Sequence, residues 1–234
     1  MSDKAQSHNI AKLVEDIRHH MDKGLPLAAK NVFTLSGTPG SGGSEIAAAM
    51  AKKAKLTVYD KSILEDVAEM SGMSLEALKM VADNRGDAKD FWLYRLFSSG
   101  GDLTHEKLQQ QLNSLFYALA HLGNCIIVGR AAHIPLQDVA DLRIRIVSGR
   151  QGSVAHMMER DALTQADADA RYDRLVKSSG RFAWNIYGTR LNEPTSFDIV
   201  VNTDSGRDYD YLADMLLGLA ARNAKHRASA RKTA

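Results

Sequence analysis

Residues 37–44 read Gly37-Thr38-Pro39-Gly40-Ser41-Gly42-Gly43-Ser44, and this glycine-rich run decides how the rest of the sequence is interpreted. Its spacing is that of the phosphate-binding P-loop, Gly-x-x-x-x-Gly-Lys-Ser/Thr, except that Gly43 stands in place of the lysine. Residues 31–36 precede the loop with an apolar pattern that predicts a buried strand, and residues 45–53 follow it with a helical pattern. The sequence therefore places a strand, a loop and a helix in the order that a P-loop needs.

Most of the affinity of a P-loop for phosphate comes from its backbone. Glycines let consecutive N–H groups converge on phosphate oxygens, and the start of the next helix adds the positive end of its dipole. We expect residues 37–44 to bind the phosphates of ATP, with the Ser44 hydroxyl at a Mg²⁺ ion. The lysine that normally reaches the β- and γ-phosphates is missing. Either another cation supplies its charge, or the chain binds nucleotide without transferring phosphate.

Length, charge and cysteine content limit the remaining interpretations. A chain of 234 residues with 44% hydrophobic residues is long enough for one sizeable α/β domain but not for two full ones. Its 30 basic and 28 acidic residues nearly cancel, which argues against a dedicated nucleic-acid or membrane binder. The N-terminus is polar, no apolar run is long enough to span a membrane, and Cys125 is the single cysteine. These features predict a cytoplasmic protein.

Short aliphatic strands alternate with helices along the chain, which predicts a parallel sheet covered by helices on both faces. In such sheets, ligands gather at the carboxyl ends of the strands, where residues 37–44, Asp60 and Arg130 would lie. The expected strands are residues 31–36, 56–59, 125–128, 142–147 and 197–201. The expected helices are residues 45–53, 61–71, 74–82, 104–122, one from Ser153, one from a Thr164 cap completed by Asp167, and 209–221.

Two terminal segments lie outside this alternation. Residues 1–26 contain an apolar stripe at helical spacing, so we expect an amphipathic helix that packs on the domain or mediates a homodimer. Residues 223–234 are basic, but the segment is short and has no aromatic side chains. We therefore expect a flexible tail rather than a specific nucleic-acid site. Residues 27–222 would form a single domain.

Four short motifs follow one another along the chain: Ser41-Gly-Gly-Ser-Glu-Ile-Ala47, Val58-Tyr-Asp-Lys61, Ile127-Val-Gly-Arg130 and Phe197-Asp-Ile-Val-Val-Asn-Thr203. In this order they resemble the cytidylate-kinase-like family of P-loop nucleoside-monophosphate kinases, in particular a bacterial branch whose Gly-Ser-Gly-Gly loop lacks the lysine. The resemblance implies a P-loop NTPase-type core, a helical acceptor-binding insertion at residues 61–122 and an arginine-rich lid at residues 160–195. It also implies an enzyme that uses ATP and Mg²⁺ to phosphorylate CMP, dCMP or a related monophosphate.

The same resemblance implies roles for individual side chains. Arg130 would grip the acceptor phosphate with Asp60 at the same site. Asp173, also placed among the acceptor-binding residues, would be an orienting partner of the neighbouring Arg174. Phosphoryl transfer brings several negative oxygens together, and guanidinium groups neutralise them well. The residues expected to do this from the lid are Arg160, Arg171, Arg174 and Arg181.

Other interpretations stay open from the residues themselves. Arg130 also suits a surface ion pair, Asp60 also suits a helix cap, and the lid arginines also suit an exposed helix. Relatives in this branch commonly carry arginine at the positions of Gly37 and Ser44, and either arginine could replace the charge of the missing lysine. This chain has neither, so Lys61 or a lid arginine is the nearest candidate for that charge. Ser148 stands where cytidylate kinases carry an aspartate, so the sequence does not fix cytosine as the base of the acceptor nucleotide. A nucleotide-binding pseudokinase and a kinase of another phosphorylated small molecule are the two alternative functions.

Overall fold

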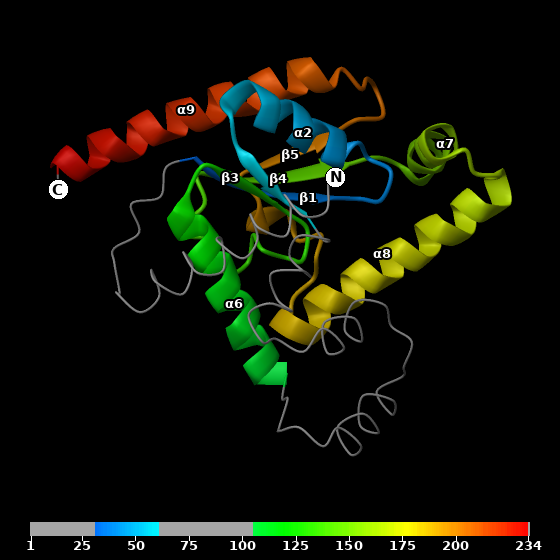
Figure 1. The fold of residues 1–234 in the computed structure, drawn as a ribbon, viewed down its shortest axis with the longest axis horizontal. Helices are drawn as coiled ribbons and strands as arrows, with labels where there is room; N and C mark the ends of the chain where they lie inside the picture. The colour runs from blue at the N-terminus through cyan, green and yellow to red at the C-terminus, as the bar shows by residue number, and fades with distance from the viewer. Residues whose placement is uncertain (1–30, 61–104, 234) are drawn as a thin grey trace, which may run out of the picture.

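Five parallel strands form a central sheet in the order β2-β3-β1-β4-β5 (Figure 1). The computed structural model describes residues 31–60 and 105–233. The strands are β1 (Val32–Gly37), β2 (Thr57–Tyr59), β3 (Cys125–Val128), β4 (Leu142–Val147) and β5 (Ile199–Asn202). All four neighbouring pairs run in parallel, so every strand ends at the same edge of the sheet. The expected parallel α/β architecture is confirmed.

Helices cover both faces of the sheet. They are α2 (Gly43–Ala54), α6 (His105–Leu122), α7 (Arg150–Asp161), α8 (Gln165–Tyr187) and α9 (Tyr209–Thr233). Helices α2 and α9 lie on one face, whereas α6 and the C-terminal part of α8 lie on the other (Figure 1). Successive side chains of the buried strands point to opposite faces of the sheet, so the strands contribute to the core on both sides. Leu35 and Ile144 pack under α2 and α9, while Val32 and Ile127 pack on the opposite face.

Helix α8 begins where the sequence predicts. The Thr164 hydroxyl accepts a hydrogen bond from the Asp167 backbone N–H over 3.2 Å, which caps the first turn. The helix then runs without interruption to Tyr187 and ends at Gly188, whose φ of 63° is left-handed. One long helix therefore makes up most of the segment expected to be the lid.

Three boundaries differ from the sequence prediction. Helix α7 begins at Arg150 rather than near Ser153, because the Asp204 carboxylate accepts a hydrogen bond from the Gly149 N–H over 2.8 Å and caps the helix from a distant part of the chain. Strand β5 begins at Ile199 rather than Phe197, since a 3₁₀ turn at Pro194–Ser196 holds the preceding residues. Helix α9 continues to Thr233 instead of ending near residue 221.

Several predicted elements lie outside the described residues. These are the helix within residues 1–26, the helices at 61–71 and 74–82, and the greater part of the 61–122 insertion. Within the described ranges, Cys125 is buried in the core, and burial raises the pKa of its thiol to about 12, as a structural cysteine requires. In residues 31–60 and 105–233, no helix has the length and apolar character needed to cross a membrane.

Candidate active site

The loop at residues 37–44 connects β1 to α2, and two of its glycines have no substitute. Gly40 and Gly42 have φ angles of 75° and 82°, which L side chains rarely adopt. A Cβ atom on Gly40 would lie 2.3 Å from the Ser153 carbonyl oxygen, and one on Gly42 would lie 2.6 Å from the Tyr209 ring. The close approach of α7 and α9 to this loop therefore depends on glycine.

Hydrogen bonds from β4 and β5 hold the loop in shape. The Thr38 N–H donates to the Ile146 carbonyl over 2.9 Å, and the Thr38 hydroxyl accepts from the Ser148 N–H over 3.0 Å. On the other side, the Thr203 hydroxyl donates to the Ser41 carbonyl over 2.8 Å. Because these partners lie in β4 or directly after β4 and β5, the sheet supports the conformation of the loop, and a preorganised loop favours anion binding.

His156 on α7 adds a further contact to the loop. Its Nδ1 lies 3.0 Å from the Gly40 carbonyl oxygen, so this nitrogen carries the proton and donates. Its Nε2 lies 3.2 Å from the Tyr209 hydroxyl, which can then donate in return. The ring is buried between α7 and α9. His156 is therefore part of the packed interior.

The interior of the loop presents polar groups that the described residues leave without partners. The Ser41 hydroxyl is buried with no hydrogen-bond partner there, and the Ser44 hydroxyl is exposed in the first turn of α2. A phosphate at this helix start would meet backbone N–H groups and hydroxyls together. In residues 31–60 and 105–233, no group of three His, Cys, Asp or Glu side chains could hold a metal. The exposed Ser44 hydroxyl could ligate a Mg²⁺ ion that accompanies a bound phosphate.

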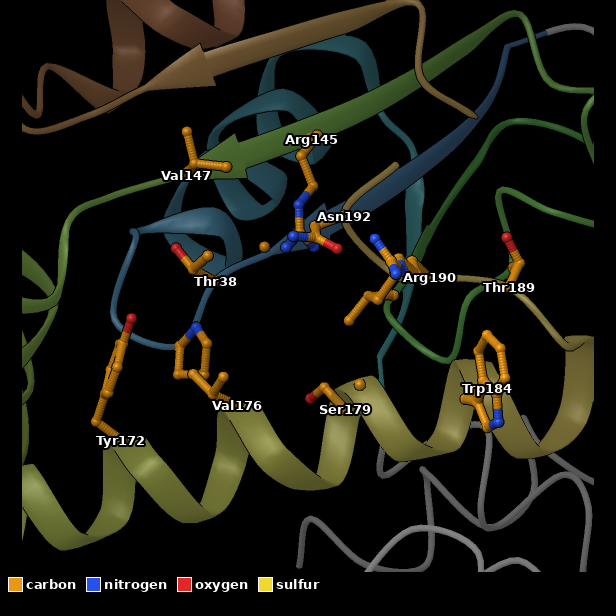
Figure 2. Close-up of a pocket in the computed structure, with 14 residues that line it drawn as sticks. Thr38, Arg145, Val147, Tyr172, Val176, Ser179, Trp184, Thr189, Arg190 and Asn192 are labelled. Atoms are coloured by element: carbon orange, nitrogen blue, oxygen red, sulfur yellow. The ribbon is translucent and has the colours of Figure 1, made fainter. Parts of the chain in front are cut away.

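A cavity of about 400 Å³ opens beside the loop (Figure 2). Its walls come from the P-loop, the end of β4, one face of α8 and the segment that follows α8. The lining residues are Gly37, Thr38, Pro39, Arg145, Val147, Tyr172, Val176, Ser179, Gly180, Trp184, Thr189, Arg190, Leu191 and Asn192. The cavity thus joins the glycine-rich loop to α8, and two arginines and two aromatic side chains line it.

Arg145 is the most buried charged group in this wall. It is 6% exposed, its Nη1 donates to the Ser36 hydroxyl over 2.6 Å, and its guanidinium carbon lies 5.8 Å from the centre of the Phe197 ring. The Nε has no hydrogen-bond partner among the described residues. Burial lowers the pKa of Arg145, but an arginine side chain stays charged in proteins.

A second polar side chain is buried on the same side of the sheet. The His133 ring lies 4.3 Å from the Phe197 ring, and its Nε2 has no hydrogen-bond partner among the described residues. Burial first, and then the positive charge of Arg145, lower the pKa of His133 to about 4. The ring is therefore neutral near pH 7 and leaves Arg145 as the local cation.

The two candidate acceptor residues lie at the ends of β2 and β3, as predicted. Asp60 directly follows β2 and is exposed. Arg130 follows β3 with a left-handed φ of 51°, and its guanidinium carbon lies 5.2 Å from the centre of the Phe182 ring on α8. Because the strands are parallel, both residues share an edge of the sheet with the P-loop.

The lid residues predicted from the sequence fall into two groups. Arg160 and Arg171 both bind Asp161, and Arg160 also lies 3.5 Å from Glu45 on α2. Asp173 accepts from Arg150 over 3.1 Å, so its partner is on α7 rather than the neighbouring Arg174. The other two, Arg174 and Arg181, form no ion pair within the described residues. Tyr187 packs in the core, whereas Trp184 lines the cavity.

Sequence reasoning missed Arg145 and Asn192, and it counted Arg190 among the basic residues of the lid segment without assigning it a role. For Arg145 a signal existed, because both faces of a strand inside a parallel sheet are normally apolar and β4 reads Leu-Arg-Ile-Arg-Ile-Val. A charged side chain at such a position needs a reason. For Arg190 and Asn192 no local pattern was available, since they lie in an irregular segment that only the fold brings to the cavity.

Comparison with known proteins agrees with this geometry. The model of the cytidylate kinase-like family matches residues 32–205. The chain belongs to the cytidylate kinase-like family. Among its relatives, the cytidylate kinase of Methanopyrus kandleri is 26% identical over 74% of this chain and 84% of its own length. The cytidylate kinase of Pyrococcus horikoshii is 24% identical over 74% of this chain and 80% of its own length.

A solved structure supports the same fold. An uncharacterized protein from Eubacterium ventriosum superposes with a TM-score of 0.56 at 18% identity, covering 82% of this chain and 99% of its own. Membership of the cytidylate kinase-like family confirms the resemblance drawn from the four sequence motifs. With it, the expected phosphotransferase class is confirmed at the level of the family, while the acceptor remains a matter for proposal.

Proposed function

We propose that the chain transfers the γ-phosphoryl group of ATP to a nucleoside monophosphate, with CMP and dCMP as the first acceptors to test. The P–O bond to ADP breaks, and a new P–O bond forms to a phosphate oxygen of the acceptor. The observation that supports the proposal is the cavity between the glycine-rich loop and α8, because residues 37–39 of the loop line it together with Arg145 and Arg190.

In this proposal each end of the site has a separate task. Residues 37–44 hold the donor phosphates, and Ser44 ligates the Mg²⁺ that accompanies the nucleotide. The metal, when bound, would neutralise charge on the phosphates. Arg130 and Asp60 hold the acceptor, with Asp173 assigned to orient it. Of the lid arginines, Arg174 and Arg181 have no ion pair within the described residues, so their charge is available to phosphate.

Trp184 gives the cavity a flat wall that suits a base. It is 61% exposed although it lines the cavity, and an exposed indole of this kind favours stacking against a planar ligand. We assign it to the nucleoside of one substrate. Trp184→Phe should preserve binding, whereas Trp184→Ala should weaken it.

The test combines calorimetry with turnover. ATP·Mg²⁺ should bind, and a coupled assay should show ADP formation with at least one of CMP, dCMP, UMP and AMP. Arg130→Ala should weaken acceptor binding and leave ATP binding unchanged. Binding of ATP with no product from any monophosphate would instead identify a nucleotide-binding pseudokinase. Turnover only with another class of phosphorylated metabolite would identify a different small-molecule kinase.

A further inference from the structure

Arg145 is a buried cation without a counter-ion in the described part of the chain. Arg143, two residues earlier on the same face of β4, donates to both oxygens of Asp198, over 2.7 Å from Nη2 and 3.2 Å from Nε. Among the described residues, the hydrogen-bond acceptor of Arg145 is the neutral hydroxyl of Ser36. Burying a charge without an opposite charge is costly, so the site is one that a bound anion would stabilise.

The sheet places this cation at the first residues of the P-loop. Strand β4 pairs with β1 so that Arg145 is opposite Ser36, the residue just before Gly37. Figure 2 shows the Arg145 side chain pointing from β4 into the cavity, between the P-loop and α8. An anion held on the cavity side of Gly37 and Thr38 would therefore face the Arg145 guanidinium.

The usual source of this charge is absent, because residue 43 is glycine. Residue 43 is the first residue of α2, and a Cβ atom there would lie 3.1 Å from the buried Leu35 Cδ2 and 3.9 Å from the Gly37 Cα. A side chain at this position would need Leu35, which is 1% exposed, to shift by a few tenths of an ångström. The lysine position thus carries no side chain, while β4 brings a cation to the loop from the neighbouring strand.

We propose that Arg145 contacts the phosphoryl group that ATP donates, and that it carries the charge normally supplied by the P-loop lysine. This role rests on the proposed function. It also explains why the residue is arginine, because a buried lysine readily loses its proton whereas a buried guanidinium stays charged and can hold two phosphate oxygens at once. The cation thus reaches the phosphate from β4 instead of α2.

The first experiment compares ATP·Mg²⁺ with ADP·Mg²⁺ by calorimetry in wild-type protein and in Arg145→Gln, which removes the charge but keeps an amide for Ser36. We expect ATP affinity to fall about 10- to 100-fold while ADP affinity changes little. The ATP affinity of Arg145→Lys should lie between those of wild type and Arg145→Gln. Arg143→Gln is the matched control, since it removes a neighbouring arginine whose charge is already paired, and it should keep the wild-type ratio of ATP to ADP affinity.

A second experiment asks whether a lysine at position 43 can replace Arg145. Gly43→Lys added to Arg145→Gln should restore part of the preference for ATP, and Gly43→Ala measures the cost of displacing Leu35. Unchanged ATP preference in Arg145→Gln, or a loss confined to the acceptor, would overturn the role. Lack of recovery by Gly43→Lys, when that variant binds ATP normally by itself, would overturn the replacement of the lysine. These readouts need no turnover, so an inactive wild-type protein would contradict the proposed kinase activity without deciding the role of Arg145.

Discussion

The Thr203 hydroxyl donates a hydrogen bond to the Ser41 backbone carbonyl over 2.8 Å and so ties the end of β5 to the P-loop. Both groups are buried, which makes the carbonyl dependent on this donor. The contact joins residues 162 positions apart in the sequence. The conformation of the loop therefore depends on a strand that is distant from the glycine-rich motif in sequence but adjacent to it in space.

Thr203→Val should remove the donor and leave the Ser41 carbonyl unsatisfied. We expect the free energy of unfolding to fall by about 1–3 kcal/mol and ATP to bind more weakly, because the loop loses one of its supports. Urea denaturation and calorimetry measure the two effects. Thr203→Ser keeps a hydroxyl and should behave much like wild type; equal stability of the valine variant would show that the bond contributes nothing.

Gly40→Ala should disrupt the loop more severely. The new Cβ would lie 2.3 Å from the Ser153 carbonyl oxygen at a φ of 75°, so the loop or α7 must move. We expect lower thermal stability and loss of ATP binding by calorimetry. Gly218→Ala is the control, because a Cβ there meets no atom within 4 Å on the exposed side of α9, and alanine should stabilise the helix by about 0.5–1 kcal/mol. Normal ATP binding by the Gly40 variant would contradict the observed packing.

His133 should make stability depend on pH. Its pKa is about 4 in the folded protein against 6.5 for the free side chain, so below pH 6.5 the unfolded chain takes up a proton that the folded protein does not. Stability is therefore full above pH 6.5 and falls toward pH 4, by about 3 kcal/mol at most. Urea denaturation of wild type and His133→Asn across this pH range gives the difference between their free energies of unfolding. Taking this difference also cancels the contribution of the carboxylates, which titrate in both proteins. A constant difference between the two proteins would disprove the effect.

Arg145 contributes to the depressed pKa of His133, after burial itself. Removing the charge in Arg145→Gln should therefore raise the His133 pKa toward its ordinary value without restoring it fully. Proton NMR titration of the His133 ring in both proteins checks this directly. An unchanged pKa would mean that the guanidinium and the imidazole do not interact.

Thr164→Ala should destabilise the start of α8. The Thr164 hydroxyl accepts from the Asp167 N–H, and loss of such a cap costs about 1 kcal/mol. We expect a lower midpoint in urea with no change in ATP affinity, since Thr164 lies at the opposite end of α8 from Trp184. Thr164→Ser keeps the cap and should match wild type. A loss of ATP affinity in the alanine variant would mean that the helix start supports the nucleotide site.

Local patterns were enough for much of this fold. The P-loop strand, β3, β4 and the Thr164 cap follow from apolar runs and from hydrogen bonds between near neighbours, and all appear where predicted. The start of α7 could not be predicted in this way, because its cap is Asp204 from beyond β5. Phe197 reads as a strand residue, yet its ring packs between His133 and Arg145 before β5 begins.

The candidate site likewise contains residues that local patterns predict and residues that depend on distant contacts. The glycine spacing alone identifies residues 37–44 as a candidate phosphate-binding loop. The positions of Asp60 and Arg130 follow from the prediction that parallel strands end at the same edge of the sheet. Arg145 could not be assigned to the loop, because its proximity to Ser36 depends on β4 lying next to β1, a pairing that the sequence order does not reveal. The identity of the missing cation is thus a question of sheet topology rather than of the motif.

The contacts that shape the P-loop also set the order in which this protein becomes competent during synthesis. Gly40 lies against Ser153, Ser41 accepts from Thr203 and Gly42 lies against Tyr209, so each support leaves the ribosome long after the loop itself. A nascent chain that ends before Thr203 carries the whole glycine-rich motif but lacks two of these three supports. The conformation of residues 37–44 is consequently completed late in synthesis, only after Thr203 and Tyr209 have emerged.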